Sequence, residues 1–354
     1  MNHDFIYEAL PTRVIFGQGK LQSLPHEVER LGARRVLVLS TPQQEPWAQN
    51  VSELLGSVSA GIYSNATMHT PVEISEQAVA QVQRLEADCV VALGGGSTTG
   101  LGKAIALRTG LPQIAVPTTY AGSEMTPILG ETENGVKTTK RLPVILPKTV
   151  IYDVDLSLTL PAALSATSGL NAMAHAVEAL YAQDRNPVTS IMAEEGLAAF
   201  ARALPTITQS PKDLEARSDA LYGAWLCGIC LASAGMALHH KLCHVLGGAF
   251  DLPHAQTHAV MLPHTAAYNS KAAADAMQRI ARALNAPDAA QGLWDLAGKL
   301  GAPRSLKELG MPETGIELAT ELALKNPYWN PRPLEADGIR KLLARAWAGE
   351  APSL

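Results

Sequence analysis

Histidines are concentrated in one short stretch of this 354-residue chain. Of its ten histidines, six lie between residues 239 and 264, where an even scatter would place fewer than one: His239, His240, His244, His254, His258 and His264. His240 and His244 are four residues apart in a helical pattern and therefore share one face of the predicted helix. Histidines at such spacings commonly bind a divalent metal, move protons, or do both.

A second helical segment adds Asn171 and His175, which are again four residues apart and share one face. Taken alone, His175 would more often be a hydrogen-bonded core histidine. Three other histidines are expected to line a helix surface or a turn: His239, His258 and His264. The set expected to act together in metal or proton chemistry is Asn171, His175, His240, His244 and His254.

A glycine-rich loop suggests a second kind of chemistry. Gly94, Gly95 and Gly96 follow a buried strand pattern and let the backbone come close to a ligand. Ser97 and Thr98 add hydroxyl and N–H groups at a helix start, which suits a pyrophosphate. The loop is neither GxGxxG nor a P-loop, because a threonine takes the place of the third glycine and the GK[ST] ending is missing.

A polar loop at residues 117–124 follows the next predicted strand. In open α/β sheets, ligands bind at the carboxyl ends of strands. The nucleotide-binding residues expected from the two loops are Gly94, Gly95, Gly96, Ser97, Thr98, Thr118, Thr119 and Ser123. After an earlier strand, the neutral Thr41 stands where an acidic residue often binds the adenosine ribose, which leaves both NADH and NADPH open as cofactors.

The elements that must position these residues change character near residue 158. Strand patterns at 13–17, 35–40, 61–64, 89–93 and 114–117 alternate with helical ones at 21–31, 72–85 and 99–108. Residues 159–354 show mainly helical patterns, at 162–183, 187–204, 218–246, 272–284, 290–300, 315–324 and 334–347. We therefore expect an α/β fold: a dinucleotide-binding parallel-sheet domain at 1–158, then an all-helical domain at 159–354. A cleft between two such domains is the usual ligand site.

Composition excludes several classes of protein. Hydrophobic residues make up 47% and charged residues 17%, which indicates a globular chain. A net charge of −5 and 5% aromatic residues argue against nucleic-acid partners. Because no apolar run of about 18 residues and no signal-peptide pattern occurs, we expect a cytoplasmic protein without a membrane partner. Cys227 and Cys230 form a CxxC in an apolar helical pattern, and we expect them to be core cysteines.

Four features in order resemble the iron-containing (group III) alcohol dehydrogenase family over nearly the whole chain: Phe16-Gly17-Gln18-Gly19, the GGGS loop, the PTT…GSE…T segment and the histidine-bearing helices. The resemblance implies the same two-domain fold, NADH or NADPH as cofactor, and a homodimer. It also adds Lys103 to the expected cofactor-binding residues, whereas Gly100 replaces the usual Asp after the loop.

That family holds a metal with one Asp and three histidines. The matching positions here are Asn171, His175, His240 and His254, and His244 matches a histidine implicated in proton transfer near the nicotinamide. Asn171 replaces the one anionic ligand. Three neutral imidazoles and an amide would hold Fe²⁺ or Zn²⁺ more weakly, so Asn171 argues against the bound metal that the resemblance implies.

Within the family, three segments resemble the branch that reduces the carbon–carbon double bond of maleylacetate to give 3-oxoadipate in aromatic catabolism: PTTYAGSEMTPILGET, TSGLNAMAHAVEALYA and ALHHKLCHVLGGAFDLPHAQTH. The expected partner is then a small dianionic oxo-acid, with His244 as proton donor and the other four site residues holding its oxygens. Three alternatives remain. They are a metal-dependent alcohol or hydroxyacid dehydrogenase, a dehydroquinate-synthase-like lyase, and a non-catalytic nucleotide- or metal-binding protein.

Overall fold

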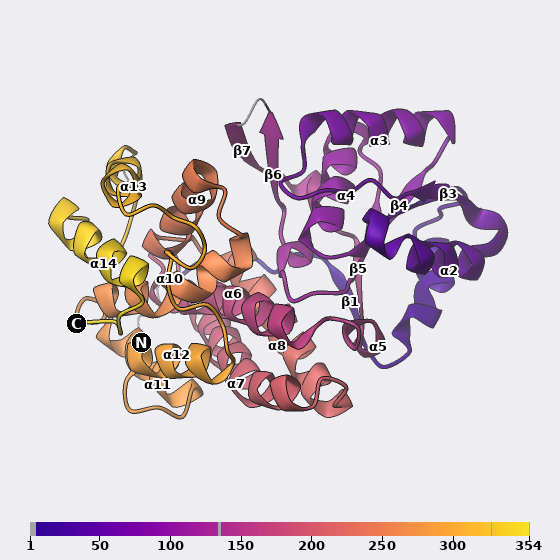
Figure 1. The fold of residues 1–354 in the computed structure, drawn as a ribbon. Coiled ribbons are helices and arrows are strands. Elements are labelled where there is room, and N and C mark those ends of the chain that lie inside the picture. Colours follow the sequence, from indigo (N-terminus) through magenta and orange to yellow (C-terminus); the bar gives the residue numbers. More distant parts are fainter. Residues whose placement is uncertain (1–4, 134–135, 327, 354) are drawn as a thin grey trace. The chain divides into compact units, whose positions relative to one another are not determined.

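The computed structural model describes residues 5–133, 136–326 and 328–353. The chain divides into two compact units (Figure 1). One is Ala9–Leu160, and the other begins at Pro161 and includes residues 5–8.

A six-stranded parallel sheet forms the centre of the first unit. Its strands are β1 (Arg13–Gly17), β2 (Val36–Leu39), β3 (Ser59–Tyr63), β4 (Cys89–Gly94), β5 (Gln113–Pro117) and β8 (Thr149–Asp153). Their spatial order is β1-β8-β5-β4-β2-β3. The chain runs outward from β2 to β3 and then returns to β4 on the other side of β2. The carboxyl ends of β2 and β4 therefore flank the point where the strand order reverses, which is where such sheets bind ligands.

Helices cover both faces of this sheet. Helices α1 (Leu24–Arg30) and α2 (Glu45–Leu55) bury Leu24, Val51 and neighbouring side chains on one face. Helices α3 (Val72–Arg84) and α4 (Gly96–Thr109) bury Val82 and Leu101 on the other. Alternate side chains of β2 and β4 thus enter two separate apolar clusters, which accounts for the continuous apolar sequences of these strands.

The sequence patterns missed several elements of this unit. The short helix α5 (Val154–Ser157), helix α2, strand β8, and the antiparallel pair β6 (Ile128–Glu133) and β7 (Val136–Arg141) were not predicted. The β6–β7 pair has the sequences ILGETE and VKTTKR, which carry little apolar alternation. Strand β8 follows the β6–β7 pair and not an α-helix, so it lies outside the alternation of strands and helices on which the prediction relied.

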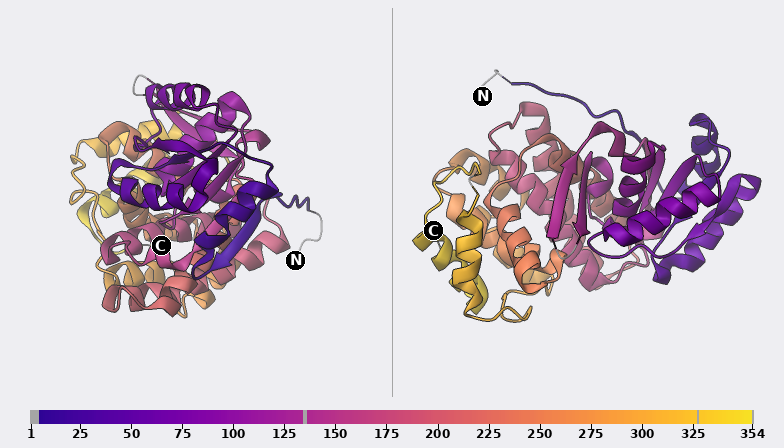
Figure 2. Two further views of the ribbon diagram at one scale, coloured as in Figure 1. Left: turned by 90° about the vertical axis from the view of Figure 1, so that its right-hand side faces the viewer. Right: turned by 90° about the horizontal axis from the view of Figure 1, so that it is seen from above.

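The second unit is helical in its described part (Figure 2). Its helices are α6 (Ala162–Tyr181), α7 (Pro187–Gln209), α8 (Leu214–Ser233), α9 (Leu238–Phe250), α10 (His254–Asn269), α11 (Ala274–Ala283), α12 (Ala289–Lys299), α13 (Gly315–Leu324) and α14 (Ala336–Ala348). Helices α6, α7 and α8 pack against one another. Helices α9, α10, α13 and α14 share a second apolar core. The expected parallel-sheet domain followed by a helical domain is confirmed.

The single helix predicted over 218–246 is wrong, because α8 and α9 meet at a 96° bend. Carboxylates from the region of α6 accept hydrogen bonds from the backbone N–H groups at the junction of α8 and α9. Gly235 donates to Asp184 at 2.9 Å, and Ala237 and His239 each donate to Glu178 at 2.9 Å. The N–H groups at the start of α9 thus have acceptors outside their own helix. These hydrogen bonds stabilise a new helix start at this position, so the chain can bend there.

Helix α10 was also missed, since Pro253 precedes it and Pro263 lies inside it. Cys227 and Cys230 are buried, unpaired core residues of α8, as predicted. Among the described helices, none alone has the length and hydropathy of a membrane span, and α8 with α9 passes that test only as a bent pair.

Candidate active site

Three helices bring the predicted histidines together. The ring of His175 on α6 stacks on that of His240 on α9, with centroids 5.2 Å apart. The His240 ring lies 6.3 Å from that of His244 and 5.0 Å from that of His258. The His258 ring in turn lies 4.4 Å from that of His254 on α10. His175, His240 and His258 are buried, whereas His244 and His254 are exposed, so the cluster has a buried floor and an accessible rim.

Glu178, one turn after His175, anchors the floor of the cluster and was not foreseen. Its Oε2 lies 2.7 Å from Nδ1 of His240, and Tyr181 donates to its Oε1 at 3.3 Å. Burial alone would raise the pKa of Glu178, but the hydrogen bond and charge of His240 lower it to about 2. Because an ionised carboxylate only accepts, Nδ1 of His240 carries a hydrogen and Nε2 faces away from Glu178.

The prediction that His239, His258 and His264 line a surface or a turn is wrong, because all three are buried. Nε2 of His239 lies 2.9 Å from Nδ1 of His258, and Nδ1 of His239 lies 3.0 Å from Oγ1 of Thr265. Burial lowers the pKa of His239 to about 3 and that of His258 well below its usual value. No sequence signal joins positions 19 residues apart on two helices, so this chain of side chains could be found only in the structure.

Several polar atoms of the cluster are buried without a hydrogen-bond partner among the described residues: Asn171 Oδ1, His175 Nδ1, His240 Nε2 and His258 Nε2. Native proteins rarely leave such atoms unsatisfied, and those that remain often mark a place where a ligand binds. Asn171 and His175 lie on successive turns of α6, as predicted. The cluster therefore has unused hydrogen-bonding capacity contributed by three helices.

The family's metal positions do not assemble a ligand set here. In the described part of the chain, only His239, Cys243 and His258 bring three donor atoms of His, Cys or carboxylate side chains within 4.8 Å of one another. Two nitrogens of that trio already share the 2.9 Å hydrogen bond. Asn171 supplies a neutral amide in place of a carboxylate. This donor chemistry fits a divalent metal poorly.

The predicted nucleotide residues lie together at the carboxyl edge of the sheet in the first unit. Gly94 pairs with Pro117 across β4 and β5, and Thr118 donates its N–H to the Gly94 carbonyl at 3.0 Å. Gln44 donates to Oγ1 of Thr118 at 2.9 Å and lies 3.5 Å from Oγ1 of Thr41. Gly94 has φ +149°, and a Cβ there would lie 2.5 Å from Oγ1 of Thr98, so only glycine fits.

The start of α4 fits a bound phosphate group. Its N-cap is Gly95, with no side-chain cap and no acidic residue in the first turn. Ser97 and Thr98 belong to that turn, and Oγ1 of Thr98 is buried with no partner in the described residues. Unsatisfied N–H groups of a 14-residue helix, together with an unpartnered hydroxyl, suit a diphosphate.

Lys103 was predicted to contact the cofactor, but in this structure its ammonium group contacts other parts of the same unit. It is fully buried, and its Nζ donates to the Ser123 carbonyl at 2.5 Å, to Oγ1 of Thr126 at 2.8 Å and to the Ile128 carbonyl at 2.8 Å. Burial lowers its pKa to about 7, against the opposing charge of Glu124. Its Nζ also lies 3.1 Å from Oγ of Ser123, so Lys103 holds the loop that contains Ser123 in place.

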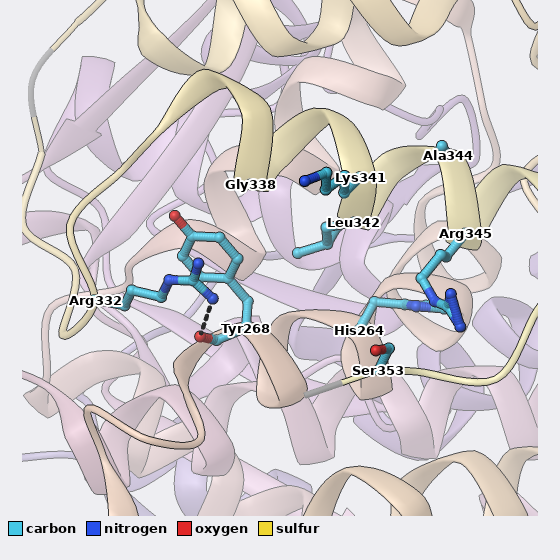
Figure 3. A pocket seen from close by; sticks show the side chains of 9 residues that line it. All are labelled: His264, Tyr268, Arg332, Gly338, Lys341, Leu342, Ala344, Arg345 and Ser353. Carbon is cyan, nitrogen blue, oxygen red and sulfur yellow. Dashed lines mark hydrogen bonds between the residues drawn. The ribbon is translucent and has the colours of Figure 1, made fainter.

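A cavity of about 400 Å³ lies elsewhere in the helical unit, between α10 and α14 (Figure 3). Its lining includes His264, Tyr268, Arg332 and Arg345, with the Arg332 guanidinium 4.1 Å from the centroid of the Tyr268 ring. Burial and the charge of Arg345 lower the pKa of His264 to about 4. None of the predicted site residues lines this cavity.

Known proteins share this fold. The family model "Iron-containing alcohol dehydrogenase" matches residues 11–154, and "Fe-containing alcohol dehydrogenase family, C-terminal" matches residues 165–347. The maleylacetate reductase of Burkholderia cepacia is 58% identical, over 99% of both chains. The crystal structure of maleylacetate reductase from Agrobacterium tumefaciens has a TM-score of 0.97 at 57% identity, covering 99% of this chain and 100% of that one.

The iron-containing alcohol dehydrogenase of Corynebacterium glutamicum is more distant, with a TM-score of 0.95 at 42% identity, covering 100% of this chain and 99% of that one. This chain belongs to the iron-containing alcohol dehydrogenase family, and the predicted resemblance is confirmed. It is an oxidoreductase.

Proposed function

We propose that this enzyme reduces the carbon–carbon double bond of maleylacetate to give 3-oxoadipate in the degradation of aromatic compounds. The observation that carries the proposal is the 58% identity over 99% of the chain to the Burkholderia cepacia maleylacetate reductase. The site supports it, because three imidazole nitrogens without a partner among the described residues, on His175, His240 and His258, suit an oxygen-rich anion once they carry hydrogens.

NADH or NADPH supplies the hydride in this reaction. The helix start at Gly95, Gly96 and Ser97 would hold the diphosphate, with Thr98 adding its hydroxyl. Thr118, Thr119 and Ser123 follow the neighbouring strand at the same edge of the sheet. Lys103 keeps that second loop in place.

Maleylacetate carries two carboxylates and a ketone conjugated to its alkene. Hydride addition at the alkene carbon β to the ketone moves negative charge onto the ketone oxygen, giving an enolate. A proton must then reach the carbon α to the ketone, which completes the saturated 3-oxoadipate. The protein must therefore hold two carboxylates, stabilise one developing oxyanion and deliver one proton.

The cluster is suited to these tasks. His244 is exposed at its rim, and we assign it the proton transfer. When His240 holds hydrogens on both nitrogens, the Glu178 carboxylate balances its charge and Nε2–H can donate to the oxyanion. Asn171, His175 and His254 would bind the remaining oxygens. An amide at position 171 spares the dianion a like-charge neighbour, which would cost on the order of several kcal/mol.

We further propose that the enzyme acts in the cytoplasm and that it forms a homodimer. Light scattering of the purified protein can test the dimer. The activity itself is tested by incubating the protein with maleylacetate and NADH, then with NADPH, and identifying the product by NMR. One 3-oxoadipate formed for each reduced nicotinamide consumed is the expected result. Reduction of the ketone to a hydroxy acid, or no turnover with either cofactor, would overturn the proposal.

A further inference from the structure

His258 has the marks of a ligand-binding side chain, although no role follows for it from the family motifs. It lies one turn after His254 on α10, and its ring contacts those of His254 and His240, with centroids 4.4 and 5.0 Å away. Its Nδ1 bonds to His239, so Nε2 points away from that residue. Nε2 is buried and has no hydrogen-bond partner among the described residues. The rings of His254 and His240 belong to the candidate active site.

A buried chain of hydrogen bonds supports the His258 ring from behind. Oγ1 of Thr265 lies 3.0 Å from Nδ1 of His239 and 3.1 Å from both the Met261 and the Leu262 carbonyls. When the hydroxyl donates to a carbonyl, it accepts from His239 Nδ1–H. His239 Nε2 then accepts from His258 Nδ1–H, and Nε2 of His258 keeps a lone pair.

The same chain allows a second arrangement of hydrogens. The Thr265 hydroxyl rotates to donate to Nδ1 of His239, and both rings carry their hydrogen on Nε2. His239 then donates to His258, and His258 presents Nε2–H as a donor. The rings of His239 and His258 stay neutral in both arrangements. His258 can therefore donate a hydrogen bond to an anionic oxygen without placing a cation in the core.

We propose that His258 is a substrate-binding residue whose Nε2–H donates to an anionic oxygen of maleylacetate. We also propose that Thr265 orients the His258 ring through His239. Both proposals rest on the proposed function. The arrangement parallels the one at His240, whose ring is fixed by Glu178 at 2.7 Å. The rings of His240 and His258 would then both donate to the dianion. The first is oriented by the Glu178 carboxylate, and the second by the neutral Thr265 hydroxyl through His239.

Two isosteric variants separate substrate binding from a structural role. In His258→Gln the side-chain amide can reach the former Nε2 position, whereas in His258→Asn it reaches only the Nδ1 position and can still bond to His239. We expect His258→Asn to raise the KM for maleylacetate on the order of 10- to 100-fold while the KM for NADH stays within about twofold, since a hydrogen bond to a charged group is lost. His258→Gln should recover most of the affinity.

The matched control is His264, a buried histidine on the same helix that belongs to the lining of the other cavity and whose Nε2 also has no partner among the described residues. His264→Asn and His264→Gln should leave the KM for maleylacetate unchanged. Thr265→Val should raise it by a smaller factor than His258→Asn, and Thr265→Ser should restore it. Melting temperatures of all variants show whether a loss of affinity merely follows a loss of folding.

The opposite ranking, with His258→Asn active and His258→Gln impaired, would overturn the proposal and leave His258 as a support for His239. Equal losses of affinity in both variants, in proportion to their falls in melting temperature, would overturn it as well. An unchanged KM in Thr265→Val would overturn the orienting role of Thr265. Wild-type protein is assayed alongside. If it turns over maleylacetate and the variants match it, this inference alone fails, whereas an inactive wild type contradicts the proposed function.

Discussion

Oε2 of Glu178 lies 2.7 Å from Nδ1 of His240, and the same carboxylate accepts the backbone N–H groups of Ala237 and His239. One buried side chain of α6 therefore performs two tasks. It satisfies the start of α9 after the 96° bend, and it fixes the orientation of a site histidine on that helix. The position of the His240 ring is thus coupled to the place where α9 begins.

Glu178→Gln should reduce both stability and turnover. The pKa of Glu178 is lowered from 4.5 to about 2, so its stabilising interaction is fully present above pH 4.5 and is lost as the pH falls toward about 2. The difference in unfolding free energy between wild type and variant should therefore be largest near neutral pH and shrink in acid. Urea denaturation at several pH values measures it. A difference that grows as the pH falls would contradict this account.

His244→Ala should lower kcat by on the order of 10²- to 10⁴-fold, because a positioned proton donor contributes about that much. The side chain is exposed, so the melting temperature should barely change. Steady-state kinetics with maleylacetate and NADH, together with thermal melting, provide both readouts. Turnover within a few-fold of wild type would show that another group delivers the proton.

Asn171→Asp should shift the site toward metal binding and away from the dianion. A carboxylate among His175, His240 and His254 restores an anionic ligand and also repels the substrate. We expect more Zn²⁺ or Fe²⁺ to be retained after dialysis, and kcat/KM for maleylacetate to fall by at least about tenfold. Elemental analysis and kinetics on the same preparation test both effects. If the variant retains no extra metal and keeps wild-type kcat/KM, our explanation of Asn171 is wrong.

Lys103→Met should raise the KM for NADH, because the carbonyls and hydroxyl that Lys103 holds in the Ser123 loop lose their donor. It should also destabilise the enzyme, by about 1–3 kcal/mol for each buried oxygen left unsatisfied. The exposed Lys148→Met in the same unit serves as the control. If Lys103→Met matches that control in NADH kinetics and in urea denaturation, the loop does not depend on the lysine.

The sequence patterns predicted the order of the two units, most helices and the two loops at the carboxyl edge of the sheet, because these depend on local periodicity and on glycines with fixed spacing. The structure was needed where side chains from distant segments decide the outcome. The bend before α9 depends on Glu178 and Asp184, which lie about 50–60 positions away. The bond between His239 and His258 joins two helices, one of which was hidden by its internal Pro263.

The most direct test of the central claim is the oxidation of NADH with maleylacetate, before and after exhaustive chelation of the protein. The account predicts a fall in NADH absorbance that depends on maleylacetate and survives chelation, because Asn171, the histidines and the nucleotide suffice for the reaction. Activity that disappears on chelation and returns with Fe²⁺ or Zn²⁺ would contradict it, and would place a metal among His175, His240 and His254.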